Sequence, residues 1–404
     1  MTIGGHHVDD AMFKYIAQNI DADTYKLLLK AEPKLTFDKS FAILQIESRR
    51  KAKNKIPELI ATERFLFPKA ISAEQCTHEL VAKFHASLFA PNSHVLDMTM
   101  GLGVDDYYIS QRVESLTAIE IDPIIAETGK HNFSILNANV RVVQGDSAQY
   151  LEQLMPEEQF DAIFIDPARR DDSGKRVYGL GDCMPNVLAL LPLIDRHCTT
   201  LFIKASPMID VTQSVHDLGD ALSDVWAVSI KNECKELFFK LDFKSMPNSI
   251  MLHAINHDKS WIEFHTPLKT AQNTKLPTAI TPEKYLYEPN ASIMKLGCHE
   301  AVEDAFGMSA IAQNSHLMLS DEPVENYPGR CFRIIETTPF KSKEIKQIGK
   351  RFKRINVATR NFRLSAEELK KRLKVEDGGT DYLFGTTLAT GEQVLIIAEK
   401  AFEN

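Results

Sequence analysis

The chain has 404 residues, of which 44% are hydrophobic and 25% are charged, and its formal net charge at pH 7 is −8. This length is enough for about two to four globular domains with cores of their own. The acidic balance excludes a protein that is a polycation throughout, no apolar run is long enough to span a membrane, and the 6 cysteines stand singly. We therefore expect a cytoplasmic protein with neither a membrane partner nor a metal site.

The first 90 residues have the pattern of a helical domain. Apolar residues recur at helical spacing in three segments, residues 11–16, 25–30 and 41–46. Asp23 and Asp38 are candidate N-caps for two of the helices. A capping-box pattern that starts at Ser72 predicts a further helix over residues 72–84, which leads into the first strand.

Residues 94–105, with the sequence His-Val-Leu-Asp-Met-Thr-Met-Gly-Leu-Gly-Val-Asp, combine a short strand, a carboxylate, a glycine pair and the start of a helix. This order is the usual place where an α/β sheet binds a nucleotide-like cofactor. Gly101 and Gly103 allow the backbone to approach a ligand closely because they lack a Cβ atom. A dinucleotide fingerprint would have a third glycine at position 106, where this chain has Asp106.

Three later predicted strands also end in acid. The second strand ends at Glu120, which can accept hydrogen bonds from both hydroxyls of a ribose. The third is followed by Asp146, which can accept a hydrogen bond from an adenine amino group. The fourth is a buried strand that breaks at Asp166-Pro167.

Strands and helices alternate through residues 91–265, which predicts a doubly wound α/β domain. Its further predicted elements are helices at 185–196 and 211–222, a fifth strand at 199–204 and paired strands at 225–231 and 236–243. The last two strands suit the antiparallel closing pair of a seven-stranded sheet. The polar residues 266–286 predict a linker.

Residues 287–404 predict a separate α+β region. Helices are expected at 289–313, 342–352 and 365–373, and strands at 331–335, 355–358, 382–387 and 394–398. Between Lys341 and Lys374 the chain has 13 Lys or Arg residues and three Glu, a net charge of +10, so the rest of the chain carries −18. Such segregation indicates a surface that binds a polyanion, most simply nucleic acid, with a solvated basic helix face as the alternative.

Several side chains of this basic region are candidates for contact with that polyanion. The phosphate contacts that we expect are Lys350, Arg351, Lys353, Arg354 and Arg360. Phe362 lies between Arg360 and Arg363, which suits stacking on an unpaired base. A place in the hydrophobic core is the alternative for Phe362.

The four strand-end motifs together resemble those of class I S-adenosylmethionine-dependent methyltransferases, over about residues 91–245. Most of the chain resembles one bacterial family of such proteins, which has a THUMP-like C-terminal domain. The matching stretches are residues 74–76, 166–170, 204–207, 233–236, 314–317, 327–330, 360–362 and 378–383. The resemblance implies a Rossmann-like sheet, a ferredoxin-like or THUMP-like C-terminal region, S-adenosylmethionine as cofactor, and RNA as partner, because THUMP domains bind RNA in tRNA- and rRNA-modifying enzymes.

The resemblance also implies site residues. The loop from Asp97 to Asp105 would hold the methionine part of the cofactor, Glu120 its ribose and Asp146 its adenine. The implied cofactor-binding residues are Asp97, Thr99, Gly101, Gly103, Asp105, Glu120, Asp122, Asp146 and Ser147, with Gln75 and Thr77 bordering the methionine end or else capping a helix. For Asp97, Asp105 and Asp122 the alternative is capping of a helix or turn.

The tetrapeptide Asp166-Pro167-Ala168-Arg169 occupies the position of the Asp-Pro-Pro-aromatic motif of amino methyltransferases. There the acid and a backbone carbonyl accept hydrogen bonds from the target amine. Ala168 and Arg169 depart from that motif, and an arginine can stack on a base or bind a phosphate through two nitrogens. Arg170 and Lys204 are further candidates for phosphate contact, with a surface salt bridge as the alternative. No cysteine follows the fifth strand, which disfavours methylation of a pyrimidine carbon.

These observations favour a methyltransferase that acts on a nitrogen of a structured RNA such as tRNA or rRNA. Two alternatives stay open. One is a methyltransferase for a protein or a small molecule, in which the C-terminal region mediates assembly. The other is a non-catalytic RNA-binding protein with a vestigial cofactor site, which the departure at Ala168 and Arg169 favours.

Overall fold

The computed structural model describes residues 1–30, 35–168, 179–245, 247–269 and 284–402. The chain divides into two compact units: unit 1 consists of Met1–Ser223 and Phe238–Pro247, and unit 2 of Asp224–Leu237 and Asn248–Asn404. Unit 1 thus combines the helical segment with most of the α/β segment, which the sequence predicts as separate domains. The last part of the predicted α/β segment belongs to unit 2.

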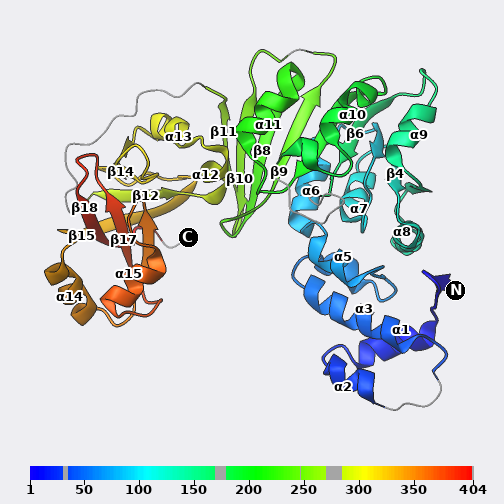
Figure 1. Ribbon diagram of the computed structural model, residues 1–404, viewed down its shortest axis with the longest axis horizontal. Coiled ribbons are helices and arrows are strands. Elements are labelled where there is room, and N and C mark those ends of the chain that lie inside the picture. Colours follow the sequence, from blue (N-terminus) through cyan, green and yellow to red (C-terminus); the bar gives the residue numbers. More distant parts are fainter. Residues whose placement is uncertain (31–34, 169–178, 246, 270–283, 403–404) are drawn as a thin grey trace. The chain divides into compact units, whose positions relative to one another are not determined.

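The N-terminal part of unit 1 is helical, as predicted (Figure 1). Its elements are the two-residue strands β1 (Thr2–Ile3) and β2 (His6–His7) and the helices α1 (Asp10–Gln18), α2 (Thr24–Leu29), α3 (Lys39–Ala52), α4 (Pro57–Ala61), α5 (Ala70–Gln75) and α6 (Glu79–Leu88). The predicted caps are confirmed, because Asp23 accepts hydrogen bonds from backbone N–H groups of α2 and Asp38 from those of α3. Met12, Phe41 and Ile46 lie in the core that these helices enclose.

The single helix predicted over residues 72–84 is wrong, because the structure has two helices, α5 and α6, with a break at residues 76–78. The predicted capping box at Ser72 does not form: α5 begins at Ala70 without a side-chain cap. Instead the His78 ring accepts a hydrogen bond from the Leu80 N–H at the start of α6. The break leaves Thr77 between the two helices, where its hydroxyl donates to the carboxylate of Asp105.

Parallel strands form the centre of the sheet in unit 1. They are β3 (His94–Asp97), β4 (Ser115–Glu120), β5 (Val140–Gln144), β6 (Phe160–Ile165) and β7 (Cys198–Ala205). Strand β3 pairs with β4 and β6, β4 also pairs with β5, and β6 with β7, all in parallel. The elements between and after them are the helices α7 (Val104–Ser110), α8 (Pro123–Ile135), α9 (Ser147–Gln153), α10 (Val187–Ile194) and α11 (Val211–Leu218) and the short 3₁₀ turns η1 (Leu180–Asp182) and η2 (Gly219–Ala221). The central strands are apolar and buried because helices cover both faces of such sheets.

Over the described residues this sheet has nine strands, in the order β11-β10-β8-β9-β7-β6-β3-β4-β5. The seven from β8 (Leu222–Ile230) and β9 (Glu233–Asp242) to β5 are the seven that the sequence predicts, so the Rossmann-like α/β fold is confirmed. Strands β10 (Met251–His257) and β11 (Trp261–Pro267) extend the sheet beyond that prediction. Strand β10 pairs in parallel with β8, and β11 pairs antiparallel with β10.

The predicted α+β region at the C-terminus is also confirmed. Its sheet has seven strands among the described residues, in the order β13-β14-β12-β15-β18-β17-β16. The elements are β12 (Tyr285–Pro289), α12 (Ala291–Leu296), α13 (His299–Phe306), β13 (Ser309–Ala310), β14 (Met318–Ser320), β15 (Gly329–Pro339), α14 (Ser342–Arg351), β16 (Asn356–Arg360), α15 (Ala366–Leu373), β17 (Asp381–Thr387) and β18 (Gln393–Lys400). Ile348 of α14 and Leu369 and Leu373 of α15 pack into one core with this sheet.

Strand β11 ends at Pro267 and β12 begins at Tyr285, each two residues inside the predicted linker 266–286. Residues 270–283 of that linker lie outside the described residues. Within the described ranges, no helix combines the length and the apolar character that a membrane crossing requires.

Candidate active site

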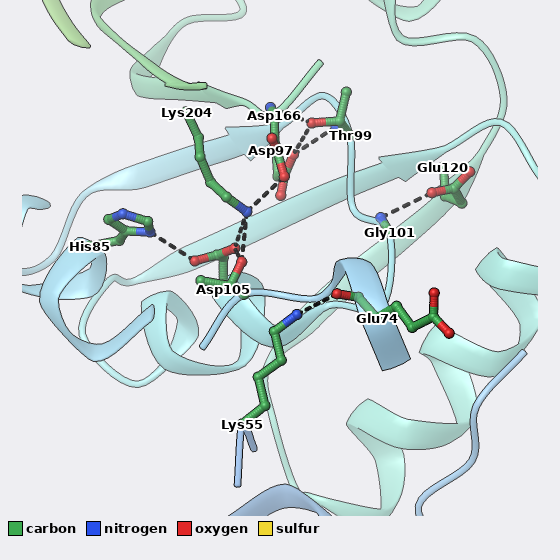
Figure 2. Close-up of polar contacts among 11 residues, drawn as sticks. Lys55, Glu74, His85, Asp97, Thr99, Gly101, Asp105, Glu120, Asp166 and Lys204 are labelled. Carbon is green, nitrogen blue, oxygen red and sulfur yellow. Dashed lines mark hydrogen bonds and ion pairs between the residues drawn. The ribbon is translucent and has the colours of Figure 1, made fainter. Parts of the chain in front are cut away.

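Four carboxylates lie where four neighbouring parallel strands end. Asp97 is the last residue of β3 and Glu120 the last of β4. Asp146 caps the helix after β5, and Asp166 follows β6 directly. Because the carboxyl ends of parallel strands lie at the same edge of a sheet, the four acids share the edge at which open α/β sheets bind ligands. Figure 2 shows three of them, Asp97, Glu120 and Asp166.

The loop between β3 and α7 lies against Glu120. One carboxylate oxygen of Glu120 accepts a hydrogen bond from the Gly101 N–H at 3.0 Å, and the other accepts one from the Asp122 N–H at 2.8 Å. Burial raises the pKa of Glu120, although these two N–H groups oppose the rise. Gly101 has a φ of +58°, and a Cβ there would meet no atom closer than 3.9 Å. The nearest neighbour of such a Cβ would be the Thr99 carbonyl oxygen, at an ordinary contact distance.

Two of the predicted cofactor ligands cap helices. One carboxylate oxygen of Asp146 accepts hydrogen bonds from the first N–H groups of α9. The second oxygen is therefore the one that we expect to accept a hydrogen bond from the adenine amino group. Ser147 is the buried first residue of α9. Asp122 caps α8 in the same way and forms an ion pair with Lys69. The capping alternative therefore accounts for Asp122.

Asp97 and Asp106 form a buried carboxyl pair behind the loop. Asp97 accepts a hydrogen bond from the Thr99 N–H at 2.6 Å, and Asp106, in the first turn of α7, is fully buried. Burial raises the pKa of Asp97 to about 7, and burial together with the charge of Asp97 raises that of Asp106 well above its ordinary value. Among the described residues no donor reaches either oxygen of Asp106. A hydrogen bond between the two carboxyls therefore requires that Asp106 keeps its proton.

The motif that contains Asp166 is held at two points. The Asp166 backbone N–H donates to the hydroxyl of Thr99 at 2.7 Å. Ala168 forms an isolated β-bridge with Met184, in which both backbone hydrogen bonds are made. Arg169 and Arg170, which the sequence selects as base or phosphate contacts, lie outside the described residues.

Lys204 is buried rather than exposed, with 7% of its surface accessible. Its ammonium donates to Asp166 at 2.7 Å, to Asp105 at 3.2 Å and to the hydroxyl of Thr77 at 2.6 Å. His85 contacts the other oxygen of Asp105 through Nδ1 at 2.9 Å (Figure 2). Burial alone would raise the pKa of Asp105, but the Lys204 ammonium and His85 hold it well below its usual range. We therefore correct the expected phosphate contact at Lys204, because a buried ammonium that bonds three oxygens of the protein is not presented to a substrate phosphate.

The basic residues at the end of α14 lie together. Lys353 and Arg354, with Lys374, line a surface depression of about 400 Å³. Arg354 also donates from Nε to the carbonyl of Asp377 at 3.1 Å. Arg351 forms an ion pair with Glu336 at 2.6 Å, so part of its charge is already balanced.

Arg360 and Phe362 contact other residues of the C-terminal domain and do not line this depression. Arg360 forms an ion pair at 2.7 Å with Glu288, a buried carboxylate that Arg330 also contacts. Phe362 packs edge-on against Phe340, with ring centroids 4.8 Å apart, within the core of the C-terminal sheet. The structure therefore favours the core alternative for Phe362 over stacking on a base.

Two residues of the site carry no signal in the sequence. His85 lies on the buried face of α6 and stacks on Phe238, with ring centroids 4.3 Å apart. From the sequence alone, Asp106 is notable only because it stands where a dinucleotide-binding fingerprint would have its third glycine. A metal site was not expected, and the described residues contain no cluster of His, Cys, Asp and Glu that could hold a metal ion.

Family models match two adjacent segments of the C-terminal region. Residues 329–400 match a family model described as THUMP domain-like, and residues 285–328 match one described as a ferredoxin-like domain. No curated protein sequence matches the chain.

The chain is similar over nearly its whole length to a solved structure from Porphyromonas gingivalis W83 that is provisionally designated a methyltransferase. The two are 29% identical, with a TM-score of 0.86 over 97% of this chain and 98% of the other. Two partial matches, each 15% identical with a TM-score of 0.31 over 41% of this chain, are an rRNA methylase from Streptococcus thermophilus and a provisionally designated methyltransferase from Streptococcus mutans in complex with SAH. They cover 94% and 96% of those two chains.

The strand order, the acids at the carboxyl edge and the full-length match define a protein of the methyltransferase fold. Its C-terminal part matches the ferredoxin-like and THUMP-like family models, as the resemblance predicts.

Proposed function

We propose that the protein is an S-adenosylmethionine-dependent methyltransferase that modifies a nitrogen of a structured RNA, tRNA or rRNA. The observation that carries this proposal is the set of acids at the ends of β3, β4, β5 and β6, with the Gly101 backbone held against one of them, Glu120.

The residues at this edge fit the cofactor. Each oxygen of Glu120 accepts one backbone N–H, and a carboxylate oxygen has a second lone pair with which it can accept a ribose hydroxyl. Asp146 would accept from the adenine amino group through the oxygen that does not cap α9. The backbone near Gly101 would approach the methionine part. When bound, S-adenosylmethionine supplies a methyl group on a sulfonium sulfur, which leaves with the electron pair of the broken carbon–sulfur bond.

Asp166 is the residue that we assign to the methyl acceptor. Its side chain is 39% exposed, so a ligand can reach it. An N–H of the acceptor would donate to this carboxylate while the nitrogen lone pair forms the bond to the methyl carbon. The proton that the nitrogen then loses would pass to the Asp166 carboxylate and from there to water. The carboxylate stabilises the positive charge that develops on the nitrogen. Because the Ala168 backbone bonds to Met184, the carbonyl of Pro167 is the candidate backbone acceptor.

The THUMP-like match and the net charge of +10 between Lys341 and Lys374 support RNA as the substrate. The test is to incubate the protein with S-adenosylmethionine labelled in its methyl group and total RNA from cells that lack this gene. Label is expected in tRNA or rRNA, in a nucleoside that mass spectrometry identifies as N-methylated. RNA from cells that keep the gene should accept little label. Label only in protein or in small molecules would overturn the assignment to RNA.

The departure of Ala168 and Arg169 from the amino methyltransferase motif favours one second candidate, an RNA-binding protein without activity. The Asp166→Ala variant separates the two. In a methyltransferase it loses turnover while calorimetry still detects cofactor binding. A wild-type protein that binds both cofactor and RNA, but labels no fraction of a cell extract from the deletion strain, would support the second candidate.

A further inference from the structure

The buried network around Lys204 carries an inference that goes beyond the cofactor motifs. Lys204 lies on β7, Thr77 in the break between α5 and α6, and Asp105 in the first turn of α7. These three elements meet at the Lys204 ammonium, whose distances to its oxygen partners are 2.6, 2.7 and 3.2 Å. The proposed mechanism uses only one of those partners, Asp166.

We propose that Lys204 is a positioning residue that orients the Asp166 carboxylate toward the methyl acceptor, and that Asp105 and Thr77 hold Lys204 in place. This inference rests on the proposed function, because it names the residue that prepares Asp166 for the acceptor.

The geometry explains how a flexible side chain can act in this way. A lysine has a four-carbon stem and three N–H donors, and alone it would sample many conformations. Here it has three oxygen partners on three different elements and is 7% exposed, so its position is fixed. Asp166 is then held on two sides: its backbone N–H donates to Thr99 of the cofactor loop, and its carboxylate accepts from Lys204.

Charge gives Lys204 a second effect on Asp166. Asp105 and Asp166 both lie within 3.2 Å of the same ammonium, and Asp105 is buried. Without the cation, Asp166 would lose the positive charge that stabilises its ionised form and would face the carboxyl of Asp105 alone, so its affinity for a proton would rise. A protonated Asp166 would present an O–H to the acceptor and would accept its N–H less well. Lys204 therefore keeps Asp166 in the ionised form that the acceptor requires.

The test compares Lys204→Met and Lys204→Arg with Lys244→Met, which removes an exposed lysine of the same unit. The first measurement is an NMR titration of protein labelled with ¹³C in aspartate carboxyls, in which the Asp166→Asn variant assigns the Asp166 signal. In Lys204→Met we expect the midpoint of Asp166 to rise by at least about one pH unit, a tenfold gain in proton affinity. In Lys204→Arg and Lys244→Met the midpoint of Asp166 should stay within a few tenths of a pH unit of its wild-type value.

The second measurement separates binding from turnover. In Lys204→Met we expect kcat for methyl transfer to fall about 100-fold, because a misplaced Asp166 carboxylate no longer aligns the acceptor with the methyl group. The Kd for S-adenosylmethionine should change less than about threefold, because Lys204 does not contact the cofactor in this proposal. Lys204→Arg should recover part of the rate. If Lys204→Met does not fold, Thr77→Val removes one anchor without leaving a buried charge unpaired, and it should lower kcat about tenfold.

Each outcome decides one of the two proposals. If Asp166 titrates in Lys204→Met as in the wild type, or kcat is unchanged in the folded variants, the positioning role is wrong and the network serves only stability. If the wild type transfers methyl groups to no RNA, the proposed function fails, and the titration of Asp166 still decides whether Lys204 controls its charge.

Discussion

A buried acid next to the loop at the end of a strand can stay neutral, and Asp106, in the first turn of α7, is the example in this chain. Its carboxyl lies next to that of Asp97, with no other donor among the described residues. Desolvation favours the neutral form of a buried carboxyl, and a second carboxyl beside it adds to the effect. The neutral Asp106 carboxyl is the form that can donate a hydrogen bond to Asp97, which accepts the N–H of Thr99. The protonation state of Asp106 thereby bears on the loop between β3 and α7.

The pair makes stability depend on pH with a definite sign. The folded state raises the pKa of Asp97 to about 7 and that of Asp106 well above its ordinary value. The contribution of these two carboxyls to the stability of the folded state is therefore full below about pH 4 and is lost as the pH rises through about 7. Asp106→Asn keeps a donor for Asp97 without a titrating proton. Between pH 5 and 8 the wild type should therefore lose about 1–3 kcal/mol of unfolding free energy relative to this variant, measured by urea denaturation. Parallel pH profiles of the two proteins would contradict the shared proton.

Glu120 offers a separate test of the cofactor assignment. Glu120→Gln keeps the size of the side chain but removes the charge that strengthens hydrogen bonds to ribose hydroxyls. Such bonds are worth about 1.5–3 kcal/mol, so calorimetry should show a Kd for S-adenosylmethionine raised about 10- to 100-fold. Glu114→Gln, at an exposed acid of the same unit, is the control and should bind normally. Equal affinities of the wild type and Glu120→Gln would remove Glu120 from the site.

At the scale of elements, the loop after β3 is fixed by packing between α7 and α8. Gly103 precedes α7 with a φ of +79°, and a Cβ there would lie 2.5 Å from the ring of Phe133 on α8. Both the backbone conformation and the close contact require glycine. The same loop carries Thr99 and Gly101, so the packing of two helices determines the shape of the proposed cofactor site.

Gly103→Ala should therefore destabilise unit 1 more than a glycine replacement that adds backbone strain alone. Gly297→Ala is the matched control, because Gly297 shares the left-handed conformation of Gly103, with a φ of +66° and a ψ of +20°, and a Cβ added there would meet nothing within 4 Å. We expect about 1 kcal/mol of destabilisation for Gly297→Ala and about 2–4 kcal/mol for Gly103→Ala in urea unfolding. Cofactor affinity should fall only in Gly103→Ala. Equal losses of stability would show that Phe133 moves aside without cost.

The elements also show what the sequence can predict here. The acids at the ends of β3 to β6 were predictable, because a buried strand, a turn and a helix start within a dozen residues leave a local pattern. The contact between Lys204 and Thr77 was not predictable, because the two residues are 127 positions apart. Thr77 also lies in a break between α5 and α6 that interrupts an otherwise continuous helical pattern. Strands β10 and β11 were missed, and Phe362 was ambiguous because an aromatic residue between arginines suits either a core or a base.

Across the whole molecule, charge is segregated along the chain. Residues 341–374 carry +10 in a protein whose total is −8, and Lys353, Arg354 and Lys374 share one surface depression. Basic residues at the end of a helix also stabilise its dipole, which is the local alternative for Lys350 and Arg351 at the end of α14. The two explanations differ in one respect: only a polyanion-binding surface should release counterions from RNA when the complex forms.

A triple variant with Lys350→Gln, Lys353→Gln and Arg354→Gln tests this difference. If the three side chains contact phosphates, RNA affinity should fall, and the slope of log K against log salt concentration should become less negative by about 2. The matched control removes three exposed lysines of unit 1, with Lys14→Gln, Lys130→Gln and Lys244→Gln. Because both variants lose three positive charges, a general effect of net charge would change both slopes alike. A change confined to the first variant would locate the RNA contact on the C-terminal domain.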